Sequence, residues 1–171
     1  ASFSVSENGV LGYDSAGDAQ VDQLVWFDRA GKRLGTVGEP GLYLRPSLSP
    51  DEKQVAVDRF DPQAGAYDLW LIELARGVST RFTFDPKNDY APVWSPDGRS
   101  IVFSSNREGL SDLYRKISSG AGKDELLLKS GNPKFPSDWS SDGRFLLYDE
   151  LSPKTKFDLW VLPLSGYKEP I

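Results

Sequence analysis

Carboxylates, hydroxyls and aromatic rings are the side chains with which this chain could do chemistry, because it contains neither His nor Cys. Without His there is no Ser-His-Asp triad, histidine general base or imidazole metal ligand within the chain. Without Cys there are no disulfides, thiolate nucleophiles or cysteine metal sites, and the redox compartment stays open. Zinc spacings, glycine-rich phosphate loops and the G-x-S-x-G nucleophile elbow are also missing from the sequence. We therefore predict a chain with no catalytic residue, cofactor or metal ion of its own.

Paired carboxylates are the one arrangement that a glycosidase could use. They occur at Asp149-Glu150 and Asp124-Glu125. A glycosidase needs its two carboxyl groups to face one cleft. Adjacent residues of a strand point to opposite faces of a sheet, so these pairs do not resemble an acid and a nucleophile.

Three further aspartates, Asp68, Asp112 and Asp158, stand 44 and 46 residues apart. Carboxylates at equal positions around a ring could converge on one metal ion. Each aspartate, however, precedes an apolar residue and an aromatic one at the start of an expected strand. There it can accept backbone N–H groups or pair with an arginine such as Arg107. We favour structural bracing and keep a metal site as the alternative.

The spacing of these aspartates is part of a longer repeat. One phrase occurs as RPSLSPDEKQVAV, APVWSPDGRSIVF and PSDWSSDGRFLLY, and its turn aspartates Asp51, Asp97 and Asp142 are 46 and 45 residues apart. The phrase containing the three aspartates follows each copy as YDLWLIEL, SDLYRKIS and FDLWVLPL. A fainter copy, SFSVSENGVLGY with DQLVWFDRAG, opens the chain. Four units therefore begin near residues 2, 45, 91 and 135.

Each unit reads as strand, turn, strand, loop, strand, turn and strand. The third copy shows why, since Pro96 presets φ, Asp97 can bond neighbouring backbone N–H groups, and Gly98 accepts a positive φ. No segment has a helical period over ten or more residues. A repeated four-stranded antiparallel unit of about 45 residues is typical of a β-propeller blade. A sandwich is the alternative, but it gives no reason for the phrase to restart with every four strands.

The phrase W-S-P-D-G-R, followed by an apolar triplet and S-N-R-x-G-x-x-D-L-Y, resembles the repeat of the TolB-like β-propeller family. The resemblance covers nearly the whole chain, is strongest from Ala91 to Gly120 and is weakest in the first unit. Other copies depart from this phrase in two places. Glu52 stands at the position that Gly98 has in the third copy, and Ser141 stands at the position of Pro96. If the turn is kept, Glu52 must adopt a left-handed conformation at a cost of about 1–2 kcal/mol.

We therefore predict an all-β fold, a β-propeller with four blades of four antiparallel strands, the last blade incomplete. The blades of this single domain span about 2–44, 45–90, 91–134 and 135–171. Val5, Leu48, Trp94 and Trp139 are expected on equivalent inner strands, and the repeated aromatics are expected to fill the space between blades. No spare strand is left to lock a ring shut, so the chain is expected to be a segment of a larger propeller. Such a segment would expose the apolar faces of its end blades. We therefore predict a homodimer or higher association, or packing against neighbouring blades of the full-length protein.

The loops of the blades are the expected binding surface, because variable loops on a repeated scaffold usually carry binding. The segments between blades are 39–45, 85–91 and 129–135, and they present aromatic residues at matching places. The alternative interpretation is that they are solvated connections with aromatics tucked into the core. The candidate partner-binding residues are Tyr43, Arg45, Asp89, Tyr90, Arg107, Lys134 and Phe135.

Charge and hydropathy limit the partners. The net charge is −5, the pI is about 4.8, and Lys and Arg are scattered, so nucleic acid is a poor candidate. The longest apolar runs are strand-sized, far short of a membrane helix, so we expect no membrane insertion of this chain. The first residues do not resemble a signal peptide, so any targeting segment is expected outside the chain.

The resemblance implies a non-catalytic, TolB-like module of a larger bacterial protein that binds or senses a protein, peptide or small ligand. Such propellers usually lie outside the cytoplasmic membrane, in the periplasm, and some follow signalling domains; a cytoplasmic location is not excluded. The alternative is the substrate-gating propeller of a prolyl-oligopeptidase-like serine peptidase whose catalytic domain lies outside this chain. A weaker alternative is a carbohydrate-processing propeller with its metal or acid–base residues in the loops or outside the chain.

Overall fold

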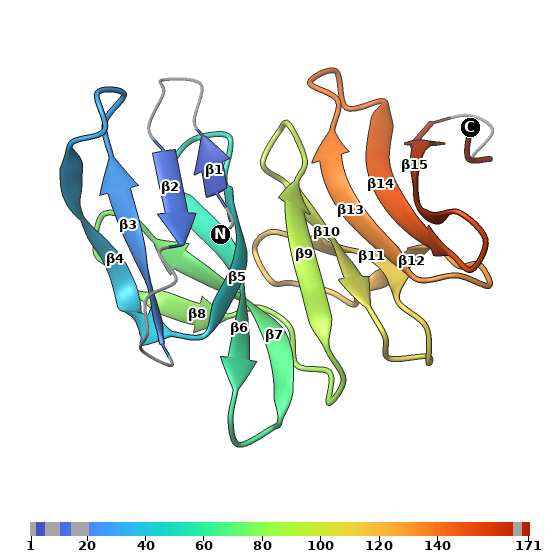
Figure 1. Cartoon of the computed structure of the whole chain (residues 1–171), viewed down its shortest axis with the longest axis horizontal. Coiled ribbons are helices and arrows are strands. Elements are labelled where there is room, and N and C mark those ends of the chain that lie inside the picture. Colours follow the sequence, from blue (N-terminus) through green and yellow to red (C-terminus); the bar gives the residue numbers. More distant parts are fainter. Residues whose placement is uncertain (1–2, 6–10, 15–20, 166–168) are drawn as a thin grey trace. The chain divides into compact units, whose positions relative to one another are not determined.

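The computed structural model describes residues 3–5, 11–14, 21–165 and 169–171. These residues contain strands, turns and loops, and none of them is helical. The chain divides into two compact units, Ala1–Pro86 and Lys87–Ile171, and each is described by itself. Figure 1 labels the strands of both units.

The first unit contains two four-stranded sheets. All strand neighbours in them are antiparallel and follow one another in sequence. The strand β5 packs against β1 and β2, so the second sheet meets the first through its own first strand. The strands are β1 (Phe3–Val5), β2 (Leu11–Asp14), β3 (Asp22–Phe27), β4 (Arg33–Gly41), β5 (Tyr43–Leu48), β6 (Gln54–Asp61), β7 (Ala66–Glu73) and β8 (Ser79–Arg81).

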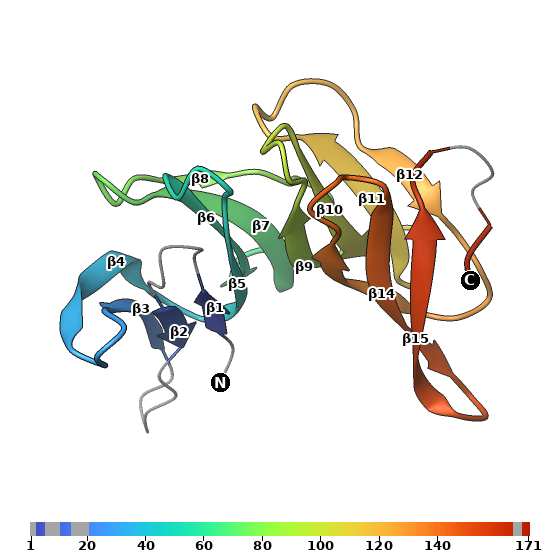
Figure 2. The ribbon, with the colours of Figure 1, turned by 90° about the horizontal axis from the view of Figure 1, so that it is seen from above.

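The second unit repeats this arrangement with a four-stranded and a three-stranded sheet. The strand β13 packs against β9, β10 and β11 of the preceding sheet. Figure 2 shows the β14–β15 hairpin projecting beyond the rest of its sheet, in agreement with its pairing as far as Ser152 and Lys156. The strands are β9 (Asp89–Trp94), β10 (Ser100–Ser105), β11 (Asp112–Ile117), β12 (Glu125–Leu128), β13 (Lys134–Trp139), β14 (Phe145–Ser152) and β15 (Lys156–Pro163).

The turn between the first two strands of a blade is held by its own polar side chains. In the β9–β10 turn, the Ser95 hydroxyl donates to Asp97 Oδ1 at 2.6 Å and accepts the Ser100 N–H at 2.9 Å. The N–H of Gly98 donates to the Ser95 carbonyl at 2.8 Å, and Gly98 has a φ of +69°. The S-P-D-G phrase therefore closes the hairpin locally, before any contact with another blade.

The same turn recurs where the phrase departs from this pattern. In the β5–β6 turn Glu52 occupies the glycine position with a φ of +57°, and its N–H donates to the Ser49 carbonyl at 2.9 Å. In the β13–β14 turn Gly143 has a φ of +76° and bonds the Ser140 carbonyl at 2.8 Å. The turn is thus kept at Glu52, in the left-handed conformation expected there.

Each unit has an apolar core between its two sheets. In the first unit the core includes Leu24, Val57 and Ile72, with Trp70 packed against it. In the second unit the core consists of Val102, Leu113, Leu146, Tyr148 and Leu162, with Trp139 and Trp160 packed against it. The repeated Trp residues on these strands are therefore packing residues, as expected.

The predicted all-β fold with four successive antiparallel sheets is confirmed. The described residues Val5, Leu48, Trp94 and Trp139 are each the last residue of the first strand of a sheet. The fourth sheet has three strands, and Ile171 bonds Val161 through its N–H at 2.9 Å and its carbonyl at 3.1 Å.

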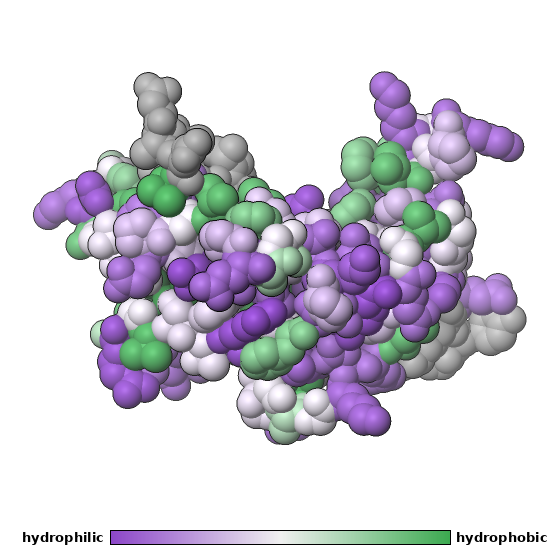
Figure 3. All heavy atoms as spheres, turned by 90° about the horizontal axis from the view of Figure 1, so that it is seen from below, coloured by the Kyte–Doolittle hydropathy of each residue, from purple (hydrophilic) through white to green (hydrophobic). Residues whose placement is uncertain are grey.

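On the face drawn in Figure 3 hydrophilic residues predominate, and hydrophobic residues form separate patches. Within the described part of the chain, no helix is long and apolar enough to cross a membrane.

Candidate functional site

The connections between blades and the loop between the second and third strands of a blade lie at one end of the blade, which we call the loop end. The loop end of the third blade holds a network of buried charges. Arg107, which follows β10, donates from Nη2 to Asp89 Oδ1 at 3.1 Å and from Nη1 to Asp124 Oδ2 at 2.7 Å. Lys116 of β11 reaches the other oxygen of Asp124 at 3.0 Å. The guanidinium of Arg107 also lies 4.4 Å from the centre of the Tyr114 ring. The network therefore joins the start of β9, the β10–β11 loop, β11 and the segment just before β12.

Arg107 is held in its charged form within this network. Burial favours a lower pKa for Arg107, but the hydrogen bond to Asp124 and the charge of Asp89 outweigh it, and the pKa is raised. Asp89 has no exposed surface, and the Arg107 side chain is 17% exposed. These two predicted binding residues are therefore engaged with each other within the blade.

Lys134, at the start of β13, is a second buried charge. Its ammonium group lies 3.1 Å from Asp112 Oδ1 and donates to the Asn132 carbonyl at 2.7 Å. The Ser104 hydroxyl donates to the Lys134 carbonyl at 2.6 Å. Because Asp112 and Ser104 belong to the preceding sheet, Lys134 joins the third and fourth blades.

The repeated aspartates act as braces. Asp68 is fully buried and accepts Arg81 Nη2 at 2.6 Å and the Thr83 hydroxyl at 3.3 Å. The hydroxyl of Thr155 donates to Asp158. The bracing interpretation is confirmed, but the cation beside Asp112 is Lys134 and not Arg107. Among the described residues no three His, Cys, Asp or Glu side chains are grouped as a metal ion requires.

Tyr43 is buried rather than presented on the loop face. It is 1% exposed within the core of the first unit, and its hydroxyl donates to the Glu39 carbonyl. Burial raises its pKa, which the nearby Arg59 partly offsets. The aromatic residue of this connection therefore packs in the core because its ring has apolar neighbours and its hydroxyl has a local acceptor.

The other three predicted binding residues reach the surface to different extents. Arg45 is exposed and has a φ of +41°, next to an irregularity in the β5–β6 pairing. Tyr90 and Phe135 are half-buried, and the Phe135 ring centre lies 6.4 Å from that of Phe157. Ala91 occupies the position of Arg45 in β9 and has a φ of +53°. The first strands of the second and third blades thus share a kink near their loop ends.

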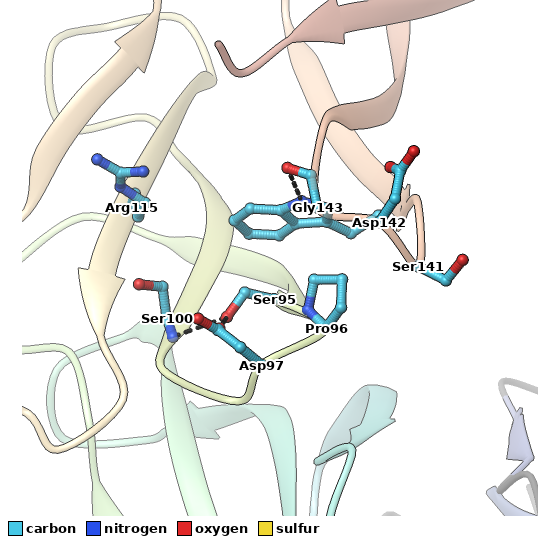
Figure 4. Close-up of a pocket in the computed structure, with 9 residues that line it drawn as sticks. Ser95, Pro96, Asp97, Ser100, Arg115, Ser141, Asp142 and Gly143 are labelled. Carbon is cyan, nitrogen blue, oxygen red and sulfur yellow. Dashed lines mark hydrogen bonds between the residues drawn. The ribbon is translucent and has the colours of Figure 1, made fainter.

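A cleft lies at the opposite end of the second unit's blades. It has a volume of about 410 Å³ and lies between the β9–β10 and β13–β14 turns. Figure 4 shows Arg115 of β11 on one side and Ser141, Asp142 and Gly143 on the other. The lining residues are Ser95, Pro96, Asp97, Ser100, Arg115, Trp139, Ser141, Asp142 and Gly143.

Comparison with known families decides what the repeated sheets are. A family model described as the TolB beta propeller domain matches residues 20–169. The chain belongs to the TolB β-propeller domain family. The resemblance identified from the repeated phrase is confirmed, and the four sheets are propeller blades.

Individual relatives match parts of this TolB domain, and the chain in turn covers only part of each relative. An uncharacterized peptidase, YuxL, of Bacillus subtilis (strain 168) is 29% identical over 60% of this chain and 16% of its own length. A TolB homolog of Chlorobium chlorochromatii (strain CaD3) is 34% identical over 63% of this chain and 23% of its own length. The structure of a putative TolB from Agrobacterium tumefaciens aligns with a TM-score of 0.82 and 21% identity, covering 99% of this chain and 63% of that one. The chain therefore spans less than a quarter of these two curated relatives and about two thirds of the similar structure.

The structure separates the predicted binding residues of this TolB domain into two groups. Asp89, Arg107, Lys134 and Tyr43 are held in internal contacts, whereas Arg45, Tyr90 and Phe135 keep accessible surface. Sequence reasoning missed the cleft at the turn end. The available signal was the recurrence of the turn phrase beside Trp139, which was interpreted only as a turn and a core aromatic.

Proposed function

We propose that this chain is the binding or sensory propeller part of a larger bacterial protein and has no catalytic residues of its own. The partner is a protein, peptide or small ligand that contacts the loop end of the blades. The proposal extends the TolB family membership to a function, and it agrees with a sequence that has neither His nor Cys.

The observation that carries the proposal is the buried bracing of the loop ends. Asp89 and Lys134 are fully buried, and their ion pairs connect loops to strands within a blade and between the third and fourth blades. Loops held in this way lose little conformational entropy when a partner binds. The accessible side chains beside them, Tyr90 and Phe135, are aromatic, a class enriched at protein interfaces. The loop end of the second unit is thus preorganised for recognition.

By the same family resemblance, we place the full-length protein outside the cytoplasmic membrane, in the periplasm. The prediction is that cell fractionation finds the full-length protein with periplasmic markers. Recovery with cytosolic markers contradicts this location without affecting the binding surface.

Site-specific photo-crosslinking in the native host tests the binding surface. A photoreactive phenylalanine analogue replaces Tyr90 at the loop end, and a control replaces Leu34, which is 57% exposed on β4 of the first unit. A defined adduct is expected from position 90 and not from position 34. Adducts from position 34 alone contradict the loop-end surface.

A second candidate function is the substrate-gating propeller of a serine peptidase. Its specific support is the similarity to the peptidase YuxL, 29% identical over 60% of this chain. The full-length sequence then contains a G-x-S-x-G segment outside this chain, and the full-length protein reacts with a fluorophosphonate probe. A full-length sequence without that segment, combined with no labelling, excludes this candidate.

A further inference from the structure

We propose that the cleft between the β9–β10 and β13–β14 turns binds a cationic side chain, arginine or lysine, of a polypeptide partner. The cleft lies at the end of β9 and β13 opposite Asp89 and Lys134, so it is a second surface, separate from the loop end. Its volume of about 410 Å³ lies at the lower end of the range typical of ligand pockets. This size suits one long side chain with its flanking main chain.

Asp97 supplies the carboxylate. Its Oδ1 accepts the Ser95 hydroxyl at 2.6 Å and the Arg99 N–H at 3.0 Å, and these bonds lower the pKa of Asp97. Its Oδ2 lies 3.9 Å from Arg99 Nε, and the Arg99 side chain is 86% exposed. Such an exposed, distant ion pair is weak. Asp97 therefore keeps a negative charge that a ligand cation can approach.

Trp139 supplies an aromatic wall. Its Nε1–H donates to the Gly143 carbonyl at 3.2 Å, which holds the indole against the β13–β14 turn. The residue is half-buried and lines the cleft together with Pro96. A guanidinium or ammonium group over an indole gains cation–π attraction, and the methylene stem of the side chain packs on apolar surface.

The charges of the lining favour a cation over an anion. Arg115 is the positive group of the lining, and its Nη2 lies 2.6 Å from Glu125 Oε2. Asp142 adds a second carboxylate, which accepts Arg144 Nε at 2.6 Å. Arg99 and Arg144 are not among the lining residues. An incoming cation therefore meets the weakly paired Asp97, whereas Asp142 is paired with Arg144 and Arg115 with Glu125.

Titration of the 171-residue chain with small probes tests the site. The cationic probes are N-acetyl-arginine amide and N-acetyl-lysine amide, the neutral probe is N-acetyl-citrulline amide, and the anionic probe is N-acetyl-glutamate amide. Binding is followed by ¹H–¹⁵N spectra at the Trp139 indole and the amides of residues 95–100, with Trp139→Phe identifying the indole signal. Saturable shifts are expected with the cationic probes only. Equal shifts with the citrulline probe, or shifts with the glutamate probe alone, overturn the proposal.

Asp97→Asn and Asp51→Asn form a matched pair of variants. Asp51 accepts the Ser49 hydroxyl at 2.7 Å in the equivalent turn of the second blade, so both variants weaken the same turn bond. Their melting temperatures should fall alike, and only Asp97→Asn should weaken cationic-probe binding, by about three- to five-fold. Unchanged affinity in Asp97→Asn, or equal weakening in both variants, overturns the proposal.

Discussion

At the scale of single residues, Glu52 is one of four non-glycine residues with a positive φ in the described part of the chain. It holds a φ of +57° at a position where two sister turns have glycine. A left-handed conformation costs a residue with a side chain about 1–2 kcal/mol. Glycine avoids this cost but loses more backbone entropy on folding, which offsets about half of the gain.

Glu52→Gly is therefore expected to stabilise the chain by about 0.5–1 kcal/mol. The reverse change in the third blade, Gly98→Ala, should destabilise by a similar amount, because Gly98 has a φ of +69°. Urea unfolding at constant pH measures both free energies. A destabilised Glu52→Gly variant, beside an unaffected Gly98→Ala variant, would show that the strain is absent.

The ionisation of Asp142 is expected to make the stability of its turn depend on pH. Hydrogen bonds from the Ser140 hydroxyl, and then from Arg144, lower the pKa of Asp142 from 3.8 to about 2. A carboxyl group with a lowered pKa in the folded state stabilises that state above pH 3.8, and this contribution is lost as the pH falls toward 2. Carboxyl NMR should show the titration near pH 2 and, in Ser140→Ala, nearer 3.8. Identical midpoints in both proteins would contradict the role of the hydroxyl.

At the scale of the elements, ion pairs at the loop ends join one strand to another. Lys134 of β13 and Asp112 of β11 are 0% and 2% exposed in their side chains. An ion pair at this depth is not necessarily more stable than two apolar residues, but removing one partner leaves an unpaired buried charge. The pair thus specifies how the third and fourth blades meet.

Lys134→Met is expected to destabilise the chain by about 3–5 kcal/mol, because Asp112 is left without its cation. Adding Asp112→Asn to the same protein should recover a large part of this loss, since the buried charge is then removed. A double-mutant cycle by urea unfolding measures both steps. Additive losses in the double variant would mean that the two side chains are not coupled.

At the scale of the whole molecule, the last sheet exposes large apolar side chains. Phe157 and Leu159 of β15 are 61% and 62% exposed, and Phe157 lies beside the half-buried Phe135. Exposed apolar patches on a sheet commonly mark an interface. The partner can be a second copy of the chain or a neighbouring blade of the full-length protein.

For the 171-residue chain we therefore expect a homodimer or higher association at micromolar concentration. Leu159→Lys should shift the sedimentation profile toward the monomer, because it places a charge in the apolar patch. Ile117→Lys, at a residue 55% exposed on β11, is the matched control and should leave the association unchanged. A monomeric parent chain would contradict the prediction.

The sequence by itself determined the blade repeat, its strands and its turns. The reason is that these features are local: Ser95, Asp97 and Gly98 close their hairpin with bonds inside six residues. At Glu52 the sequence left open whether the turn is kept, and the structure shows that it is, with a φ of +57°.

The tertiary structure alone decided which side chains are available to a partner. Asp112 and Lys134 are 22 residues apart, and their pairing depends on how two sheets pack, which no local pattern specifies. The same holds for Tyr43, whose burial depends on the core of the first unit. The cleft beside Trp139 forms because two turns with the same local phrase lie next to each other, and that proximity is a property of blade packing.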